Sequence, residues 1–155
     1  MRPVYETEAH LLGEEEVAKK LEEWINNPLA TVVKTPPLAP YDYCIVKKGL
    51  ISGVVEIKVR SNPSDKYPTY MISLHKLEDL ARLHAFSGKP CILVVQWSQD
   101  NPRSDSNAER CSSDDLRWWT VPKSVEHLDI EMGGTYRRGD PQDREPVVMI
   151  PIEEF

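Results

Sequence analysis

An acid and a base lie two residues apart inside an otherwise apolar run of the chain. Residues 53–59 read Gly-Val-Val-Glu-Ile-Lys-Val, and this largely β-branched composition predicts a strand. Side chains alternate along a strand, so Glu56 and Lys58 share one face with Val54. Burying a charge is costly unless the charge is paired or binds a metal ion. The placement of Glu56 and Lys58 therefore predicts a functional site.

A second carboxylate, Asp42, precedes this strand. The Glu-x-Lys pattern alone proves little in a chain with 15 Glu and 10 Lys, so its context must carry the argument. Residues 41–47 follow a proline-rich turn and predict another strand, and Lys47-Lys48-Gly49 fits a hairpin turn. An antiparallel hairpin closed there brings Asp42 near Glu56. Two carboxylates and a lysine are what a hard divalent cation and a phosphodiester require.

The residues before this hairpin predict an amphipathic helix over residues 10–26. Apolar side chains recur at positions 17, 18, 21, 24 and 25, which is a helical stripe. Glu14 lies on this stripe, whereas Glu15 and Glu16 lie off it. Glu14 also falls in the first turn, where the helix dipole favours an anion. The position suits either a solvated acidic helix start or a catalytic carboxylate.

The residues after the hairpin predict a crossover unit. A helix over residues 73–87 ends at Gly88 and Pro90, and the apolar residues 91–97 predict a strand covered on both faces. Strand, helix and strand in this order imply a mixed α/β sheet. His75 and His84 are nine residues apart, about 180° around a helix, so they cannot bind one ion together. His84 fits a core-edge position, and His75 could approach a phosphate.

Asp42, Glu56 and Lys58 resemble the signature of the PD-(D/E)XK nuclease superfamily, with Tyr41 where the family name has proline. The order of the elements is most similar to archaeal Holliday-junction resolvases and to phage and VRR-type nucleases. That order is a helix with a Glu, strands with Asp and with Glu-x-Lys, a helix and an apolar strand, here residues 10–26, 41–47, 52–59, 73–87 and 91–97, followed by a strand at 116–123. The resemblance covers roughly residues 10 to 125.

This resemblance implies an α/β fold with a restriction-endonuclease-like core, in which helices flank a mixed central β-sheet. It implies one such domain over residues 1–155, with residues 126–155 as a C-terminal extension. It also implies that Asp42 and Glu56 hold Mg²⁺, with Mn²⁺ as a substitute and the Ile57 carbonyl as a further ligand. Glu14 would complete the first or a second metal site, and Lys58 would orient or activate the attacking water and offset transition-state charge.

The activity that the resemblance implies is Mg²⁺-dependent endonucleolytic hydrolysis of DNA, with branched DNA such as a Holliday junction as substrate. Three alternatives stay open. The first is a generic phage or restriction-type DNA nuclease, and the second is a nuclease-fold module that binds DNA or a protein without cleaving. The third is an unrelated α/β binding domain with a chance Glu-x-Lys, which predicts that Asp42 and Glu56 lie far apart.

The acidity of the chain is the main objection to a DNA-binding enzyme. The net charge is −6, whereas DNA-binding proteins are typically basic. Residues 1–99 are neutral, with 12 basic and 12 acidic residues, so the excess lies in residues 100–155. A neutral core can still carry a basic rim for phosphate, although each such residue could equally be solvated surface. The candidate DNA-binding residues are Lys47, Lys48, Arg60, Lys66 and His75.

Composition excludes several other classes. No segment approaches the roughly 20 apolar residues of a membrane span, and we expect no secretory signal. The three cysteines indicate reduced thiols in an intracellular protein, in the cytoplasm of a bacterial, archaeal or phage-infected cell. No Cys/His cluster suggests zinc, and the glycine pairs lack the lysine of a P-loop, so no nucleotide cofactor is expected.

The last third of the chain yields weaker predictions. Residues 98–115 are polar and predict a mobile loop, and Val147–Ile152 predicts an edge strand bounded by prolines. Arg137 and Arg138 could bind phosphate or pair with nearby aspartates. Trp118 and Trp119 should face opposite sides of a strand, which leaves one of them exposed. Because resolvases cut two symmetric strands, the resemblance also implies a homodimer.

Overall fold

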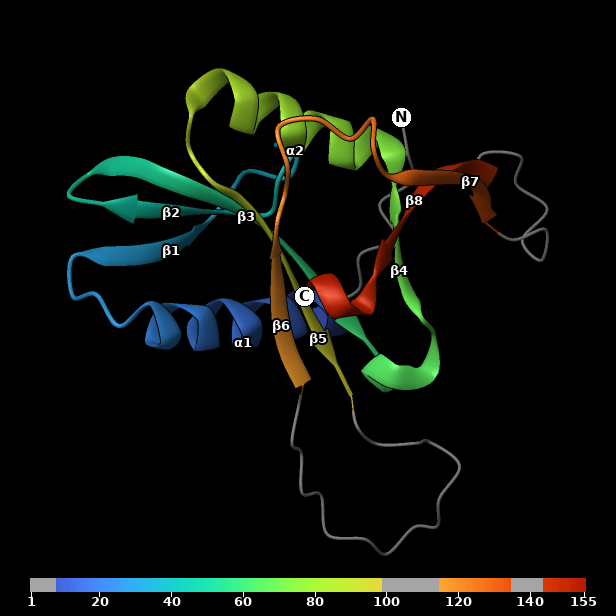
Figure 1. Cartoon of the computed structure of the whole chain (residues 1–155). Coiled ribbons are helices and arrows are strands. Elements are labelled where there is room, and N and C mark those ends of the chain that lie inside the picture. Colours follow the sequence, from blue (N-terminus) through green and yellow to red (C-terminus); the bar gives the residue numbers. More distant parts are fainter. Residues whose placement is uncertain (1–7, 99–114, 135–143) are drawn as a thin grey trace, which may run out of the picture.

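The computed structural model describes residues 8–98, 115–134 and 144–155, which form two sheets and two α-helices (Figure 1). The larger sheet has five strands in the order β1-β2-β3-β5-β6. The smaller sheet has three strands in the order β4-β8-β7. The predictions for residues 99–114 and for Arg137 and Arg138 lie outside the described residues.

The β2–β3 hairpin lies in the middle of the larger sheet. Strand β2 (Tyr43–Lys47) pairs antiparallel with the long strand β3 (Leu50–Arg60), as predicted. Lys48 and Gly49 form the turn with φ of 51° and 76°, a conformation that suits a two-residue hairpin loop and that glycine adopts at little cost. On the other side of β2, strand β1 (Ala30–Lys34) pairs antiparallel with it. Strand β1 was not predicted from the sequence.

Strand β3 also pairs with β5 (Cys91–Trp97), and this pairing is parallel. A parallel pair needs a crossover, which here consists of strand β4 (Thr69–Ser73) and helix α2 (Leu74–Ser87). Helix α2 ends at Gly88, whose φ of 67° is the left-handed conformation of a helix cap. Strand β6 (Asp115–Thr120) then pairs antiparallel with β5. The predicted mixed sheet is therefore confirmed.

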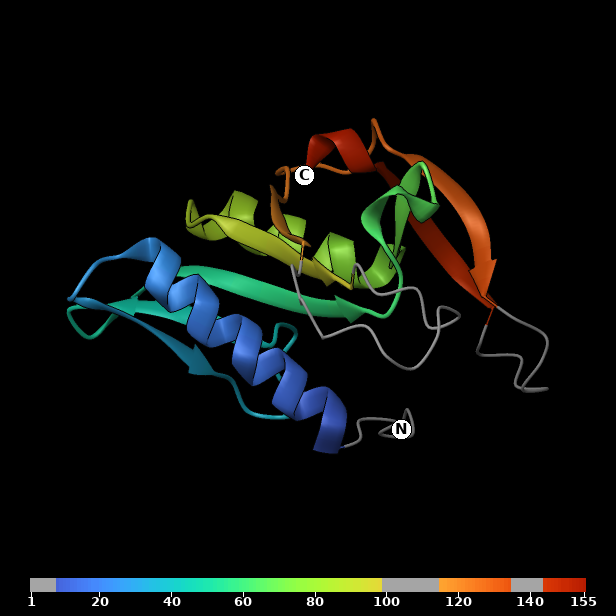
Figure 2. The ribbon, with the colours of Figure 1, turned by 90° about the horizontal axis from the view of Figure 1, so that it is seen from below.

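Helices α1 and α2 cover opposite faces of the larger sheet (Figures 1 and 2). Helix α1 (Glu8–Ile25) packs Val17, Ala18 and Leu21 into one buried cluster with Val55 and Ile57 of β3. Helix α2 packs Leu77, Leu80 and Ala81 into the other, with Val54, Leu93 and Val95 among its buried members. The alternation along β3 thus divides its side chains between two cores.

The smaller sheet corrects the prediction for residues 147–152. Strand β8 (Arg144–Pro151) is the central strand of this sheet, between β4 and β7 (Asp129–Gly134), rather than an edge strand. The prolines of β8 do not make it an edge strand, because Pro146 and Pro151 lie towards its ends. The backbone of the residues between them can hydrogen-bond to both β4 and β7. Val148 and Ile150 join the buried cluster that contains Leu93.

We predict that two Gly→Ala substitutions change stability in opposite directions. A Cβ on Gly133 would lie 2.6 Å and 2.7 Å from the two methyl carbons of Val147. Gly133→Ala should therefore lower the free energy of unfolding by about 1–3 kcal/mol through overpacking. A Cβ on Gly13, within helix α1, would lie 3.7 Å from Val59, an ordinary contact. Gly13→Ala should raise that free energy by up to about 1 kcal/mol.

Urea unfolding followed by circular dichroism measures both changes. Equal effects of the two substitutions would contradict the close packing of β7 on β8.

Candidate active site

Strand β3 presents Glu56 and Lys58 on the face that is covered by α2 and the smaller sheet. Val54, on the same face, belongs to the buried cluster of α2, whereas Val55 and Ile57 face α1. Glu56 has no exposed surface, although it is a carboxylate. The Lys58 side chain is 32% exposed, so the pair opens towards solvent at its lysine end.

Asp42 is held next to this pair by the hairpin. Its Oδ2 accepts a hydrogen bond from the backbone N–H of Ile57, with an N···O distance of 3.1 Å. Its own carbonyl accepts bonds from both the N–H and the hydroxyl of Thr35, each at 2.9 Å, which ties the residues before β2 in place. Asp42 therefore reaches the centre of β3 from the neighbouring strand, as the sequence predicted.

Two lysines meet the two carboxylates. Lys58 Nζ lies 2.6 Å from Glu56 Oε1 and 3.7 Å from Asp42 Oδ2. These contacts place the carboxylates closer together than the roughly 8 Å limit for sharing one ion. The alternative of a chance Glu-x-Lys predicted a larger separation and is not supported. Lys76 Nζ, from the first turn of α2, lies 3.0 Å from Glu56 Oε2 and also donates to the carbonyl of Pro40.

The pKa shifts follow from burial and from this pairing. Burial raises the pKa of Glu56, the Asp42 charge raises it further, and the two lysines oppose the shift. Burial acts to lower the pKa of Lys58, but the charges of Glu56 and Asp42 outweigh it, so the pKa lies above its usual value. Lys58 is therefore an ammonium at neutral pH. In this state it can donate hydrogen bonds to a water or an oxyanion but cannot accept a proton.

The donor set fits a hard divalent cation. Both oxygens of Glu56 are buried, and each is met by the ammonium group of one lysine. Among the described residues, no three His, Cys, Asp or Glu side chains cluster as a ready metal site. Mg²⁺ is commonly bound by one or two carboxylates, with waters and substrate phosphates completing its shell. Asp42 and Glu56 supply two such carboxylates.

Glu14 lies on the other side of the sheet, in α1. Its Oε2 pairs with Lys34 Nζ at 2.7 Å, and Lys34 also lies over the Tyr43 ring, 4.7 Å from its centroid. Burial opposes the charged form of Lys34, but the bond to Glu14 outweighs it and raises the pKa. Within the described part of the chain, Glu14 belongs to no group of three His, Cys, Asp or Glu side chains that could hold a metal ion. Its metal-binding role stays a prediction.

The five candidate DNA-binding residues do not form one rim. Lys47 and Lys48 lie at the turn that begins β3, and Arg60 ends this strand ten residues later, a distance of roughly 30 Å. Lys66 lies just beyond Arg60, in the short 3₁₀ helix η1 (Ser64–Lys66). His75 is 79% exposed and pairs with Asp79 at 3.8 Å. Arg60 and Lys66 are thus the candidates on the Lys58 side.

Sequence reasoning missed two residues of this site. Lys76 carried no signal, because one lysine among the polar residues of a helix is ordinary. Glu145, on β8, accepts a hydrogen bond from Ser73 Oγ at 2.8 Å. Glu145, Lys58 and Lys76 line one cavity of about 320 Å³. No pattern near Glu145 could have placed it there, because β4 and β8 pair across more than 70 residues.

The mixed α/β fold and the grouping of Asp42, Glu56 and Lys58 define a protein of the PD-(D/E)XK nuclease class. The chain belongs to the family described as "Phage putative PDDEXK endonuclease", which matches residues 1–155. It is therefore a member of a family of endonucleases that act on phosphodiester bonds. No curated protein matches the sequence. In the described residues, no helix is long and apolar enough to cross a membrane.

The chain is also similar to the structure of Hjc from Archaeoglobus fulgidus, a Holliday junction resolvase from an archaeal hyperthermophile. The two share 12% sequence identity with a TM-score of 0.46, over 90% of this chain and 84% of Hjc.

We predict that Lys58→Met destabilises the protein in the presence of EDTA. Removing the ammonium leaves the buried Glu56 paired with Lys76 alone, which should lower the free energy of unfolding by about 1–3 kcal/mol. The matched control is Arg82→Met, which breaks a surface pair with Glu78 whose side chains are 75% and 38% exposed. That change should cost less than about 1 kcal/mol. Urea unfolding measures both changes in the free energy of unfolding. Equal losses in the two variants would contradict the prediction that leaving the buried Glu56 without Lys58 is especially costly.

Proposed function

We propose that this protein is a Mg²⁺-dependent endodeoxyribonuclease that hydrolyses phosphodiester bonds in branched DNA. The observation that carries the proposal is the meeting of Asp42, Glu56 and Lys58 on two paired strands, with Glu56 fully buried. Buried, closely spaced carboxylates are costly for the fold unless a cation neutralises them. Family membership supports the endonuclease activity, and the donor set supports the metal.

Each residue has a role that its position supports. Asp42 and Glu56 would hold Mg²⁺, together with the carbonyl of Ile57, and Glu14 would complete the first or a second site. The ion would polarise the phosphate and lower the pKa of a bound water. The Lys58 ammonium would donate to the attacking water and offset charge that develops on the phosphate. Lys76, released from Glu56, would donate to a neighbouring phosphate oxygen.

We expect Asp42→Asn, Glu56→Gln and Lys58→Ala each to reduce DNA cleavage by at least about 100-fold, as loss of a group that stabilises transition-state charge does. Cleavage of a labelled four-way junction and of a linear duplex with the same sequence is measured with Mg²⁺, with Mn²⁺ and with EDTA. Arg82→Met is the control, since it changes a 75% exposed side chain of α2 that pairs with Glu78. The junction should be cut faster than the duplex, and EDTA should abolish both reactions.

Undiminished cleavage by a folded Glu56→Gln protein would refute the assignment of the site. Equal rates on junction and duplex would favour a generic phage or restriction-type nuclease.

A second candidate function is a nuclease-fold module that binds DNA or protein without cutting. One observation favours it, because Lys58 and Lys76 together already neutralise Glu56 without a metal ion. Calorimetric titration with Mn²⁺ separates the two functions. The endonuclease should bind Mn²⁺, and this binding should be lost in Asp42→Asn. No binding at millimolar Mn²⁺ would favour the non-cleaving module.

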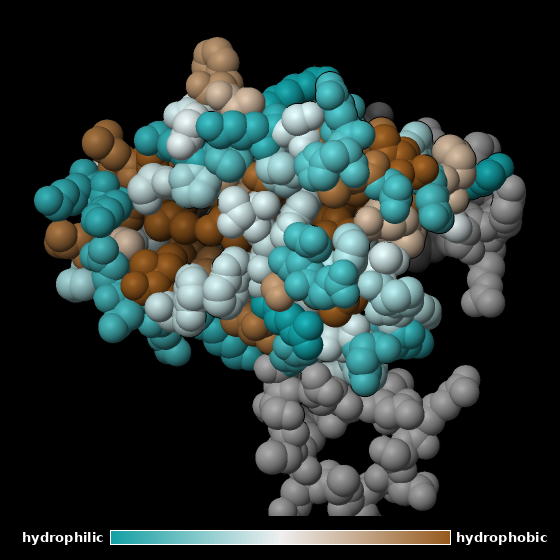
Figure 3. Space-filling model, viewed as in Figure 1, coloured by the Kyte–Doolittle hydropathy of each residue, from teal (hydrophilic) through white to brown (hydrophobic). Residues whose placement is uncertain are grey.

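We also propose that the protein is a homodimer, since two symmetric cuts need two sites. Trp119 is buried, whereas Trp118 is 43% exposed. The Trp118 ring packs against Trp24, which is 57% exposed, with 4.2 Å between the ring centroids and 44° between the ring planes. This aromatic pair is a candidate interface. Apolar side chains are also exposed elsewhere, over the β1–β3 strands and near β7 (Figure 3). The hypothesis tested below is that two copies of the protein associate through Trp24 and Trp118.

We expect light scattering at tens of micromolar protein to give twice the 17.8 kDa monomer mass. Trp118→Glu should shift this mass to the monomer. Phe86→Glu, which changes a side chain that is 95% exposed at the end of α2, should leave the dimer intact. A monomer mass for the unchanged protein would overturn the proposal.

A further inference from the structure

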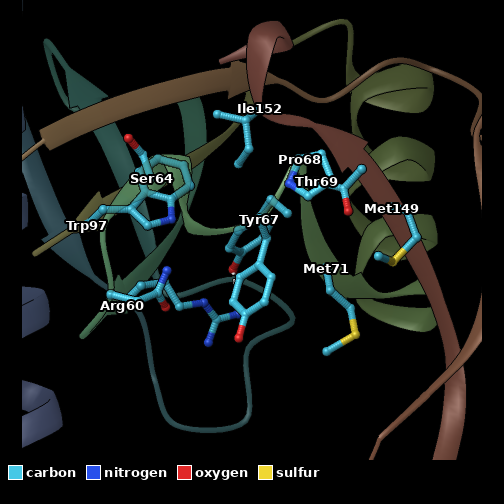
Figure 4. A pocket seen from close by; sticks show the side chains of 11 residues that line it. Arg60, Ser64, Tyr67, Pro68, Thr69, Met71, Trp97, Met149 and Ile152 are labelled. Carbon is cyan, nitrogen blue, oxygen red and sulfur yellow. Dashed lines mark hydrogen bonds between the residues drawn. The ribbon is translucent and has the colours of Figure 1, made fainter. Parts of the chain in front are cut away.

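A cavity lies beyond the end of β3, between the two sheets (Figure 4). Its volume is about 550 Å³. Arg60 and Trp97, the last residues of the parallel strands β3 and β5, form one side. Tyr67, Thr69 and Met71 of the following segment and of β4 form the other. The carboxyl ends of parallel strands are where α/β proteins commonly bind ligands.

The lining of this cavity suits a flat aromatic group. The rings of Tyr70 and Trp97 are 4% and 2% exposed and pack edge to face, so the core fixes their positions. Tyr67 is 56% exposed, and the Lys66 ammonium lies 5.2 Å from the centroid of its ring. Tyr67 is therefore a ring on which a ligand can stack. The lining also includes polar side chains, among them Arg60, Asn62 and Thr69.

The cavity adjoins the candidate active site. Arg60, Tyr70 and Met71 line both this cavity and the smaller one that contains Lys58 and Lys76. Glu56, Lys58 and Arg60 alternate along one face of β3, with about 6.6 Å between successive members. This spacing is close to the length of one nucleotide in an extended strand. If one phosphate of a DNA strand lies at Lys58, the next phosphate of that strand would therefore lie near Arg60.

Arg60 stands at the border between the two cavities. Its guanidinium donates a hydrogen bond to the Tyr70 hydroxyl at 2.9 Å and lies 4.9 Å from the centroid of that ring. The guanidinium is thereby oriented, and its planar donors suit a phosphate group. A DNA strand with a phosphate bound at Arg60 would place the attached base at the mouth of the larger cavity.

We propose that this cavity binds an unstacked nucleobase of the DNA strand next to the scissile phosphate, with the base stacked on Tyr67. The inference rests on the proposed DNA-cleaving function and adds a base-binding subsite to it. A paired base would have to leave the duplex stack to enter such a cavity, whereas an unpaired base at a branch or bulge can enter it directly. The subsite would favour substrates with unpaired bases and tolerate any base, because every base has a face that stacks.

The experiment compares binding of three duplexes that have the same length and flanking sequence. One is fully paired, one carries a single bulged adenine, and one carries an abasic site in place of that adenine. Binding is measured by fluorescence anisotropy in EDTA, which removes divalent cations so that the DNA is bound without being cleaved. The variants are Tyr67→Ala, which removes the stacking ring, and Tyr67→Phe, which keeps it.

We expect Tyr67→Ala to weaken binding of the bulged-adenine duplex about tenfold, within the range for loss of one base–aromatic stack. Tyr67→Phe should bind it within about twofold of the unchanged protein. Neither variant should change affinity for the paired or the abasic duplex. An equal loss on all three duplexes, or no loss on the bulged one, would overturn the subsite.

The outcome for the subsite can be separated from that for the proposed function. Failure of the unchanged protein to bind any of the three duplexes would overturn both proposals. Cleavage that depends on Glu56, together with a bulge affinity unchanged in Tyr67→Ala, would overturn the subsite alone. Thermal unfolding of Tyr67→Ala serves as the folding control, and the exposure of Tyr67 predicts little change.

Discussion

The fold depends on neutralising one buried carboxylate. Glu56 has no exposed surface, and its charge is met by Lys58 from its own strand and by Lys76 from α2. Breaking such a buried arrangement costs far more than losing a surface ion pair. Asp42 adds a second negative charge to the same place, held there by the backbone of Ile57. The position of α2 relative to the β2–β3 hairpin is therefore tied to the residues that would perform the chemistry.

The parts of this arrangement that sequence could predict are local. Lys48 and Gly49 close a tight turn that brings β2 and β3 together, so Asp42 approaches Glu56. A β-bulge between Ile45 and Val46, which no sequence pattern indicated, shifts the pairing by one residue, so that Tyr43 pairs with Val55. The apolar residues Cys91–Trp97 form a strand covered on both faces, as their composition indicated. His84 likewise satisfies its Nδ1 with the Val121 carbonyl at 2.6 Å, as expected of a core-edge histidine.

The parts that sequence could not predict depend on contacts between distant segments. Strand β4 is five residues long and begins just after Pro68, and its partner strand β8 lies more than 70 residues later. No local pattern records that pairing, so Thr69–Ser73 was not recognised as a strand. Lys76 and Glu145 entered the site only because β4, β8 and the start of α2 are brought together. Their residue types alone are ordinary surface charges.

The smaller sheet consequently helps to shape a site whose chemistry lies on the larger one. Tyr70 of β4 accepts a hydrogen bond from Arg60, and its ring packs against both Trp97 and Phe155, with centroid distances of 6.0 Å and 5.6 Å. Tyr70 also lines the smaller cavity that contains Lys58. A shift of β4 would therefore move Arg60 and disturb Lys58 together. This coupling gives the residues after 125 a structural reason to belong with the nuclease core, in agreement with a family match that extends over residues 1–155.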